Sequence, residues 1–352
     1  MRDLLAATAE LVAIPSLSTH ERLIADYVEA ELRRPGWLEV VRVGDNVVAR
    51  TGFGLPRRLV LAGHLDTVPP KDNDLPTVDG DTLWGLGSAD MKGGLAVMID
   101  LATSVAAAPV DLTYVFYVAE EIARSYNGLL SVAADRPELL QASAAIVCEP
   151  TNCTVEAGCQ GVLKVEVAMG GERAHTARPW AGRNAVHRLG PVIAAVAGWP
   201  GREVVVQGCR YKESLQAVAI SGGVAANVVP DLAVVELNHR FAPDRTMTEA
   251  EGSIREFLGR FLDEGDVFRV TDSAPAAPPS LDDPLLAALV DAAGGAKSGK
   301  LGWTDVAFFA ERGVPAANFG PGDPELAHHA GEMVRRASLE RARSVLGHLL
   351  GE

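Results

Sequence analysis

The spacing of hydrophobic residues in the first 160 positions predicts helices that alternate with buried strands. Apolar side chains recur at helical intervals in Leu4–Val12 and in residues 21–33, and Gly93–Ser104 is an Ala-rich helical segment. Short apolar runs between these segments predict buried strands. The alternation predicts an α/β domain, a mixed sheet with helices on both faces. The expected strands are Leu38–Arg50 (a pair turning at Gly44–Asn46), Arg58–Gly63, Leu112–Ala119 and Ala144–Cys148.

A different pattern begins near residue 160. Val162–Met169 alternates between apolar and polar residues, as in a strand with one exposed face. The order of the segments that follow favours antiparallel pairing, so we expect a separate α+β domain with an antiparallel sheet. Its further segments are the helices Arg183–Val196 and Thr248–Asp263 and the strands Val204–Gln207, Ser214–Ser221, Ala233–Phe241 and Asp266–Thr271.

The Pro- and Ala-rich stretch Ala274–Ser280 marks the end of this second pattern. The α/β pattern then returns, with a helix beginning at Pro284, a strand at Val314–Phe319 and an amphipathic terminal helix at Met333–Leu350. We therefore expect residues 1–160 and 274–352 to form one domain. Residues 161–273 form a second domain inserted into it, of ordinary domain size.

Composition narrows the classes of function. The chain carries 46 acidic and 32 basic residues, a formal charge of −14, which disfavours binding to nucleic acid or to an anionic membrane. No apolar run approaches the roughly 18 residues that span a bilayer. Asp3 and Glu10 interrupt any signal-peptide core, so we expect a cytoplasmic protein. The four cysteines form no Cys-x-x-Cys pair and are expected to be reduced thiols.

Candidate chemistry follows the buried strands. In open α/β sheets, ligands bind beyond the carboxyl ends of the strands. Any one polar residue at such a position is more often an ordinary loop residue. Together these residues form a nitrogen and oxygen ligand set that suits Zn²⁺, with Co²⁺ or Mn²⁺ as substitutes, and their number suggests two ions. The residues are His64, Asp66, Asp90 in a Gly-rich loop, Glu120, Glu121, Glu149, and His328 with His329.

The pair Glu120-Glu121 is the sharpest local signal. Neighbours on an extended segment point in opposite directions, so one carboxylate can bind metal while the other acts as a base on water. Asp66, two residues after His64, can accept the second imidazole N–H and fix its tautomer. The Gly85–Gly94 loop matches neither a P-loop nor G-x-G-x-x-G, which disfavours nucleotide binding.

The inserted segment carries a second group of polar residues. His175 and Arg178 share one turn, while Asn227 precedes a strand that carries Arg240. Asparagine and arginine at such positions can hold a substrate carboxylate, and a bidentate arginine is the natural choice. Taken alone, a turn histidine or a strand arginine is more often structural.

Taken together, these residues resemble the dinuclear-zinc aminoacylase/carboxypeptidase family of metallopeptidases. The resemblance spans nearly the whole chain in the order of the family. It implies a zinc-binding catalytic domain and an inserted domain that serves as lid and homodimer interface. The matching pieces are Gly63–Pro69, Gly87–Gly94, Glu120-Glu121, Glu149–Thr151, and His328 with Glu332.

The resemblance also implies a role for each site residue. Asp90 bridges two zinc ions; His64 and Glu149 complete one site, and Glu121 and His328 complete the other. The remaining roles are a general base and acid at Glu120, oxyanion stabilisation in the neighbouring subunit by His175, and substrate binding by Arg178, Asn227 and Arg240.

Within the family, the sequence resembles the succinyl-diaminopimelate desuccinylase branch. That branch hydrolyses N-succinyl-LL-2,6-diaminopimelate to succinate and LL-2,6-diaminopimelate, in lysine and peptidoglycan biosynthesis. Acetylornithine deacetylase, aminoacylase and dipeptidase activities are the alternatives, and a non-catalytic metal-binding homologue is the remote one. Phe308 stands where the branch is expected to carry arginine, and Ile122–Tyr126 also departs from its pattern, so the exact acyl-amino acid stays open.

Overall fold

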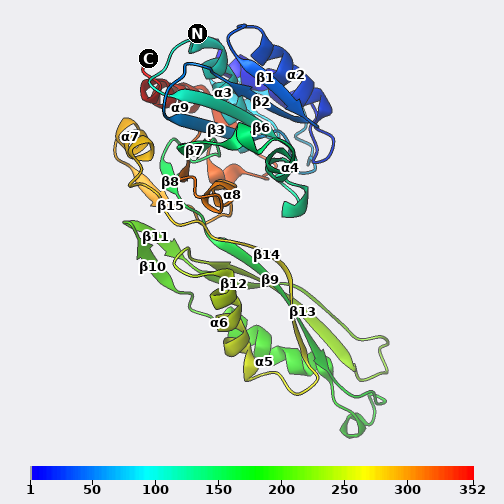
Figure 1. The fold of residues 1–352 in the computed structure, drawn as a ribbon. Coiled ribbons are helices and arrows are strands. Elements are labelled where there is room, and N and C mark those ends of the chain that lie inside the picture. The colour runs from blue at the N-terminus through cyan, green and yellow to red at the C-terminus, as the bar shows by residue number, and fades with distance from the viewer. Residues whose placement is uncertain (1) are drawn as a thin grey trace. The chain divides into compact units, whose positions relative to one another are not determined.

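The computed structural model describes residues 2–352 and divides the chain into two compact units (Figure 1). The first unit comprises the chain up to Gly158, Pro279–Ser298 and Phe308–Glu352, and the second comprises Cys159–Pro278 and Gly299–Ala307. The divisions near residues 158 and 278 lie close to the expected junctions.

Residues 299–307, which the sequence analysis assigned to the catalytic domain, fall instead in the second unit. Two contacts explain this assignment. A side chain at Gly299 would stand only 2.7 Å from the Arg210 carbonyl oxygen, and the Trp303 indole donates a hydrogen bond of 3.2 Å to the Pro275 carbonyl. Close packing within the second unit, rather than the local hydrophobic pattern, therefore decides that residues 299–307 belong to that unit.

The first unit is built on an eight-stranded mixed sheet, with the order β1-β2-β6-β3-β7-β16-β8-β15. The strands β6, β3, β7 and β16 run parallel, while β1, β2 and β8 pair antiparallel at the flanks. The expected mixed α/β architecture is confirmed. The bounds are β1 Glu39–Val43, β2 Asn46–Arg50, β3 Arg58–His64, β6 Asp111–Tyr117, β7 Ala144–Val147, β8 Val155–Ala157, β15 Lys297–Gly299 and β16 Ala316–Asn318.

The central parallel strands end at one edge of the sheet. In the register, His64 at the end of β3 faces Tyr117 at the end of β6, and Ala62 faces Val147 at the end of β7. These strands are buried almost throughout, as parallel strands covered on both faces must be, and this is why they read as continuous apolar runs. The polar residues that follow the three strands therefore emerge at a common edge.

Helices of the first unit pack against the sheet and against one another. The helix α3 lies against α1, α2, α9 and the strands β3 and β6, and nearly all of its residues are buried. Asp3 caps α1 by accepting the Leu5 and Ala6 N–H groups. The bounds are α1 Leu4–Val12, α2 Arg22–Arg33, α3 Gly93–Ser104, α4 Gly128–Asp135, α7 Pro284–Ala292, α8 Val306–Ala310 and α9 Arg336–Leu349. Within residues 2–352, no helix is long and apolar enough to cross a membrane.

A small three-stranded sheet, β17-β5-β4, was missed from the sequence. The terminal helix was predicted to begin at Met333, but residues 333–335 pair with β5 and the helix begins at Arg336. Strands of three residues are too short to show a period, so their pairing is decided by tertiary contacts. The bounds are β4 Thr77–Asp79, β5 Thr82–Trp84 and β17 Met333–Arg335.

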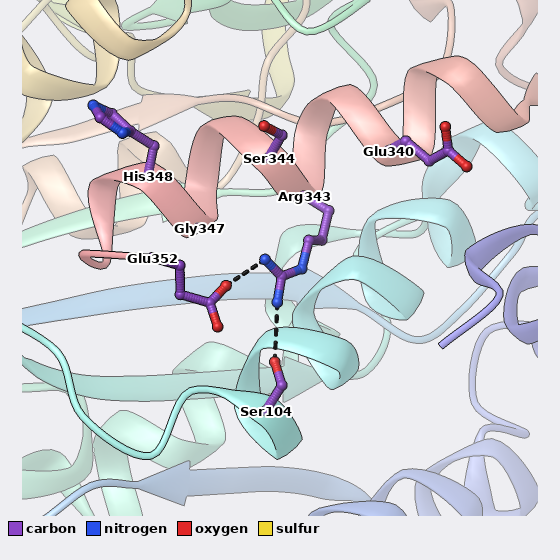
Figure 2. Close-up of a pocket in the computed structure, with 7 residues that line it drawn as sticks. All are labelled: Ser104, Glu340, Arg343, Ser344, Gly347, His348 and Glu352. Carbon is purple, nitrogen blue, oxygen red and sulfur yellow. Dashed lines mark hydrogen bonds and ion pairs between the residues drawn. The ribbon is translucent and has the colours of Figure 1, made fainter. Parts of the chain in front are cut away.

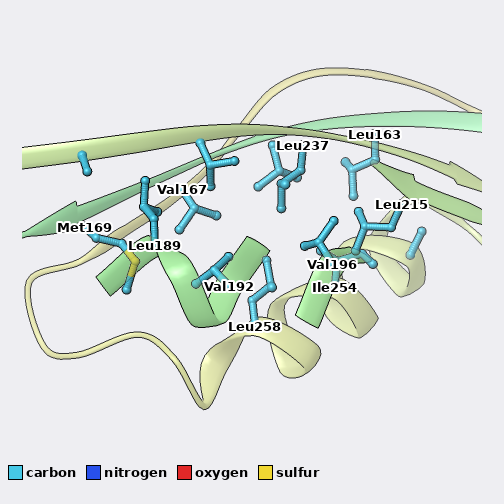
Figure 3. Close-up of a cluster of buried hydrophobic side chains, with 14 of the residues drawn as sticks. Leu163, Val167, Met169, Leu189, Val192, Val196, Leu215, Leu237, Ile254 and Leu258 are labelled. Carbon is cyan, nitrogen blue, oxygen red and sulfur yellow. The ribbon is translucent and has the colours of Figure 1, made fainter. Parts of the chain in front are cut away.

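The second unit is an antiparallel sheet with the order β12-β13-β9-β14, and helices α5 and α6 bury one of its faces (Figure 3). Alternate residues of β9 and β13 enter this core, which explains their period-two pattern. A separate hairpin pairs β10 with β11. The bounds are β9 Gly161–Gly170, α5 Ala185–Ala197, β10 Glu203–Val206, β11 Cys209–Lys212, β12 Ser214–Gly222, β13 Leu232–Phe241, α6 Met247–Gly259 and β14 Val267–Ala274.

The edge strand β12 is unusually open. Its residues from Gln216 to Gly222 are all exposed, including Val218 and Ile220, which are 60% and 58% exposed. An exposed edge strand presents unpaired backbone groups to which another strand can bind. This apolar edge is therefore a surface that a second chain can cover.

Candidate metal centre

Three side chains from distant segments meet beyond the strand ends of the first unit. Ligand atoms of His64, Asp90 and Glu121 all lie within 4.8 Å of one another. His64 Nε2 is 3.1 Å from Asp90 Oδ1. His328 Nε2 is 3.7 Å from Asp90 Oδ2 and 2.9 Å from Glu121 Oε1. The Asp90 carboxylate thus lies between two imidazoles with one oxygen toward each, the placement that a ligand shared by two cations requires.

His64 is held by Asp66. The imidazole is 1% exposed, and its Nδ1 lies 3.0 Å from the Asp66 carbonyl oxygen and 3.4 Å from its carboxylate. This contact directs Nε2 toward Asp90, as metal-ligating histidines require of their outer partners. Burial lowers the pKa of His64, but the bonds to Asp66 and Asp90 outweigh it and leave the pKa well above its usual value.

Asp66 has a second contact that the sequence did not reveal. Its two carboxylate oxygens accept the backbone N–H groups of Glu120 and Glu121, each at 3.0 Å. Ser18 donates a further hydrogen bond of 2.7 Å. Burial alone would raise the pKa of Asp66, but the bonds from His64, Ser18 and Glu120 lower it. One buried carboxylate therefore orients both the first histidine and the glutamate pair.

Of the two adjacent histidines, His328 faces the cluster. Its side chain is half-exposed, and its backbone is left-handed with a φ of 62°. His329 instead accepts the Gly331 N–H at Nδ1. The hydrogen bond to Glu121 and the charges of Glu121 and Asp90 raise the pKa of His328 to about 9, although burial lowers it. A cluster that stabilises protonated imidazoles is one that attracts positive charge.

Glu149 and Glu120 lie at the same edge of the sheet. Glu149 follows Cys148 directly after β7 and is 6% exposed. The segment that leads to Glu120 is fixed by two backbone hydrogen bonds. Val118 donates its N–H to Asn46, and Glu120 itself donates its N–H to Asp66. The edge therefore gathers two imidazoles and several carboxylates, a donor set of nitrogen and oxygen that fits a zinc-type cation.

In the second unit, His175 and Asn227 lie on adjacent loops. Thr176 donates its N–H to the Asn227 carbonyl at 3.0 Å, and His175 forms a backbone bridge to Val228. His175 Nδ1 accepts the Ala177 N–H at 3.1 Å. Arg178 closes the same turn by donating its N–H to the His175 carbonyl at 2.7 Å.

Arg240 is not part of this group. It lies near the far end of β13, where it pairs with Val162 and Ser214, and burial lowers its pKa. The strand begins at Leu232, so at about 3.3 Å per residue Arg240 is roughly 26 Å from the end that follows Asn227. Within one chain, the structure therefore separates Arg240 from His175, Arg178 and Asn227.

The two departures from the expected branch pattern meet in the first unit. Arg124, in the segment after the glutamate pair, forms an ion pair with Glu311. The neighbouring Arg312 places its guanidinium 3.6 Å from the centroid of the Phe308 ring and donates to the Phe308 carbonyl. Phe308 itself is 1% exposed. At this place the chain thus carries a buried ring with the Arg312 guanidinium against it.

A surface cavity elsewhere in the first unit is distinct from the metal cluster (Figure 2). Its central side chain, Arg343, pairs with Asp100 and Glu352 and donates to Ser104. These contacts fasten α9 and the C-terminal residue to α3. The cavity is lined by Ser104, Glu340, Arg343, Ser344, Gly347, His348 and Glu352.

Several relatives match the chain over nearly its full length. A protein of Mycobacterium tuberculosis named "Putative succinyl-diaminopimelate desuccinylase DapE" is 46% identical over 351 residues, covering 99% of this chain and 98% of that protein. A "Succinyl-diaminopimelate desuccinylase" of Corynebacterium glutamicum is 43% identical over 357 residues, covering 99% and 96%.

The fold is shared with a solved tripeptidase of Staphylococcus aureus. Its TM-score is 0.80 at 20% identity, and the match covers 99% of this chain and 97% of that one. The sequence profile described as "Peptidase family M20/M25/M40" matches residues 60–352, a range that contains His64, Asp90, Glu121 and His328. The expected metallopeptidase resemblance is confirmed, and the chain belongs to peptidase family M20/M25/M40.

Proposed function

We propose that this protein is a zinc-dependent amidohydrolase that cleaves N-succinyl-LL-2,6-diaminopimelate to succinate and LL-2,6-diaminopimelate. The observation that carries the proposal is the identity of 46% and 43%, over nearly full length, with relatives named for that reaction. The cluster of His64, Asp90, Glu121 and His328 supplies the chemical groups that metal-dependent amide hydrolysis needs.

Two zinc ions fit the donor set. In the proposed arrangement, Asp90 would be shared by the two ions. His64 and Glu149 would hold one of them, and Glu121 and His328 would hold the other. The separation of the Asp90 oxygens toward two different imidazoles supports this division. When bound, zinc supplies Lewis-acid chemistry that polarises the amide carbonyl and lowers the pKa of water.

Glu120 is the proposed general base and acid. Asp66 fixes the backbone of Glu120 and Glu121 together, so one carboxylate can remain at the cluster while its neighbour is held next to the reacting water. Glu120 takes a proton from that water and then delivers it to the nitrogen of the leaving amine, as a single carboxylate can do in both directions.

His175 is proposed to stabilise the oxyanion of the tetrahedral state. Because its Nδ1 accepts the Ala177 N–H, the neutral ring carries its proton on Nε2. Nε2 is then a hydrogen-bond donor that can be aimed at developing negative charge, a type of contact worth about 3 kcal/mol in catalysis. Arg178, Asn227 and Arg240 are the proposed contacts of the substrate carboxylates.

A homodimer through the second unit accounts for the separation of these groups. His175 and Asn227 lie at one end of the sheet and Arg240 lies at the other. In a dimer, one copy can supply His175 and Asn227 to an active site while the other copy supplies Arg240. The exposed apolar edge of β12 offers the surface along which two copies can pair. In such a dimer, each active site takes His175 from the partner subunit.

A substrate panel on the zinc-loaded protein tests the proposal. Turnover of N-succinyl-LL-2,6-diaminopimelate should exceed turnover of N-acetylornithine, other acyl-amino acids and dipeptides by at least tenfold in kcat/KM. Preferred hydrolysis of acetylornithine or a dipeptide would replace the proposed substrate with another of the same reaction class. Zinc uptake without hydrolysis of any acyl-amino acid would instead favour a non-catalytic metal-binding homologue.

A further inference from the structure

Glu332 is a buried carboxylate to which the mechanism above assigns no role. It is 1% exposed. One carboxylate oxygen accepts the N–H groups of Ala89 and Asp90, and the other accepts the N–H of Gly87, all at 2.9 Å. Three such bonds from one short segment make Glu332 the main polar anchor of that segment.

The segment that Glu332 binds needs such an anchor. It leads from Gly85 to Asp90 and contains glycines with φ of 148° at Gly85 and 79° at Gly87, which other residues rarely adopt. Glycine-rich backbone gains little order from local preference, so its position depends on external hydrogen bonds. Two of the bound amides belong to Asp90 itself and to its neighbour Ala89, so the anchor acts at the ligand's own backbone.

Glu332 also belongs to the segment that carries His328. Its N–H donates to the His329 carbonyl at 3.0 Å, and its own carbonyl accepts the Gly85 N–H at 3.1 Å. Asp90 and His328 are far apart in sequence, yet their ligand atoms lie 3.7 Å apart. Glu332 is thus hydrogen-bonded to the loop that carries Asp90, and it lies four residues after His328 in the chain.

We infer that Glu332 is a positioning residue that joins the Asp90 loop to the His328 segment and thereby sets the metal affinity of the cluster. This inference rests on the metal centre of the proposed function, but not on the identity of the substrate. Outer-sphere partners of metal ligands typically change affinity by about tenfold to a hundredfold when altered.

The test is Glu332→Gln, measured by direct metal binding. Glutamine keeps the shape but presents an NH₂ group where one oxygen accepted, so at least one backbone N–H is left facing a donor. We expect the Zn²⁺ dissociation constant to rise by about tenfold or more in a chelator competition. The visible absorption spectrum of the Co²⁺-loaded protein should also shift, because the placement of Asp90 relative to His328 changes.

Asp111→Asn is the matched control. Asp111 is also buried in the first unit and accepts two backbone N–H groups, from Phe53 and Leu55, at 2.8 and 2.9 Å. It stands at the beginning of β6, at the opposite end of the strand from Glu120. We expect Asp111→Asn to lower the melting temperature but to leave Zn²⁺ affinity within twofold and the Co²⁺ spectrum unchanged.

Glu332→Asp keeps the inference testable where the glutamine variant fails to fold. The shorter carboxylate retains the charge but cannot reach all three amides, so we expect intermediate Zn²⁺ affinity and partial recovery of the Co²⁺ spectrum. Wild-type affinity and spectrum in either folded Glu332 variant overturn the inference, and so does an equal loss in Asp111→Asn. Because metal binding is read without substrate, these outcomes are separate from those of the substrate panel.

Discussion

The two units of the molecule hold their functional side chains in opposite ways. In the first unit, His64 and Asp66 are 1% exposed and bonded to one another and to the neighbouring loop. In the second unit, His175, Arg178 and Asn227 are exposed on loops. The first unit therefore holds its candidate cation ligands in a preorganised arrangement. The second unit carries exposed polar groups that a substrate or a partner subunit can contact.

The difference follows from the two sheets. Parallel strands covered on both faces end together, so the residues after them converge in a partly buried place. The antiparallel sheet of the second unit is covered by helices on one face, and its edge strand β12 is open. We therefore expect metal binding to depend on the first unit alone and full activity to require both units.

The largest effect is expected from Asp90→Ala. Both imidazoles of the cluster lie within 4 Å of the Asp90 carboxylate, so its removal takes away the ligand that the two proposed cation positions would share. We expect loss of bound zinc, measured by metal analysis, and a fall in turnover of roughly four orders of magnitude or more.

Asp81→Ala is the control for this change, since Asp81 is an exposed carboxylate of the same unit that pairs with Arg336. It should keep zinc and activity. An Asp90→Ala protein that retains two zinc ions would contradict this expectation, because the first unit would then bind metal without its central carboxylate.

The next effect is expected from Glu120→Gln. The variant removes the proposed general base but keeps the backbone bond to Asp66, so zinc content should be unchanged. Turnover should fall by about a hundredfold to ten-thousandfold with little change in KM. Glu138→Gln, an exposed glutamate paired with Arg136, should have no effect. Unchanged turnover in Glu120→Gln would refute its role.

A mixing experiment tests whether the second unit serves a neighbouring copy. His175→Ala should lower turnover by about a hundredfold to a thousandfold while zinc is retained. Random pairing of Glu120→Gln with His175→Ala subunits makes half of the dimers mixed, and one of two sites in each is intact. The mixture should therefore recover about a quarter of wild-type activity.

The edge strand provides the control for mixing. Mixtures that also carry Val218→Asp and Ile220→Asp on β12 should stay monomeric in light scattering and recover nothing. Val267→Asp, at an exposed site on the opposite edge strand β14, should not prevent recovery. Recovery that survives the β12 changes would show that copies pair through a surface other than β12. No recovery in the simple mixture would contradict the sharing of His175 between subunits.

The smallest effect concerns the stability of the second unit. Burial raises the pKa of Asp266, but the hydrogen bonds from Arg188 and from the Asp263 and Gly170 N–H groups have the larger effect. Together they lower the pKa to about 2. A depressed carboxylate pKa contributes stability above the unfolded value near 4, and this contribution is lost as the pH falls from about 4 to 2. Asp266→Asn should cost about 2 kcal/mol at pH 7.

Urea unfolding of wild type and Asp266→Asn at several pH values measures this cost. The difference between the two proteins should shrink below pH 4, and zinc content should stay equal at pH 7. Glu264→Gln, two positions away on the same turn, provides the control. Zinc loss in Asp266→Asn at pH 7 would mean that the two units are not independent in metal binding.

Much of the secondary structure could be predicted because it is local. The helix Leu4–Val12 and the helix Gly93–Ser104 have the same bounds in the structure as in the prediction. Each is a mostly apolar run whose local sequence favours a helix. The strands β4, β5 and β17 could not be found, since three residues show no period and only pairing stabilises them.

The contact of Asp66 with His64 was predicted, but the backbone contacts of Asp66 with the glutamate pair and those of Glu332 could not be. Both carboxylates accept backbone N–H groups, and every non-proline residue carries such a donor, so no residue type in the sequence marks the partner. The positions of Arg240 and His175 at opposite ends of one sheet were hidden for a related reason. Their separation depends on strand length and register rather than on the identity of either residue.

The sequence by itself determined the kind of chemistry, because the residues that follow apolar strands are read directly and their types select a cation such as zinc. Tertiary structure alone decided which Asp90 oxygen faces which imidazole, which buried carboxylates hold the loops, and which strand edge is left open. The physical reason is the distance along the chain between the residues that interact. Residue type and local period are properties of neighbouring positions, whereas these contacts join backbone and side chains brought together only by packing.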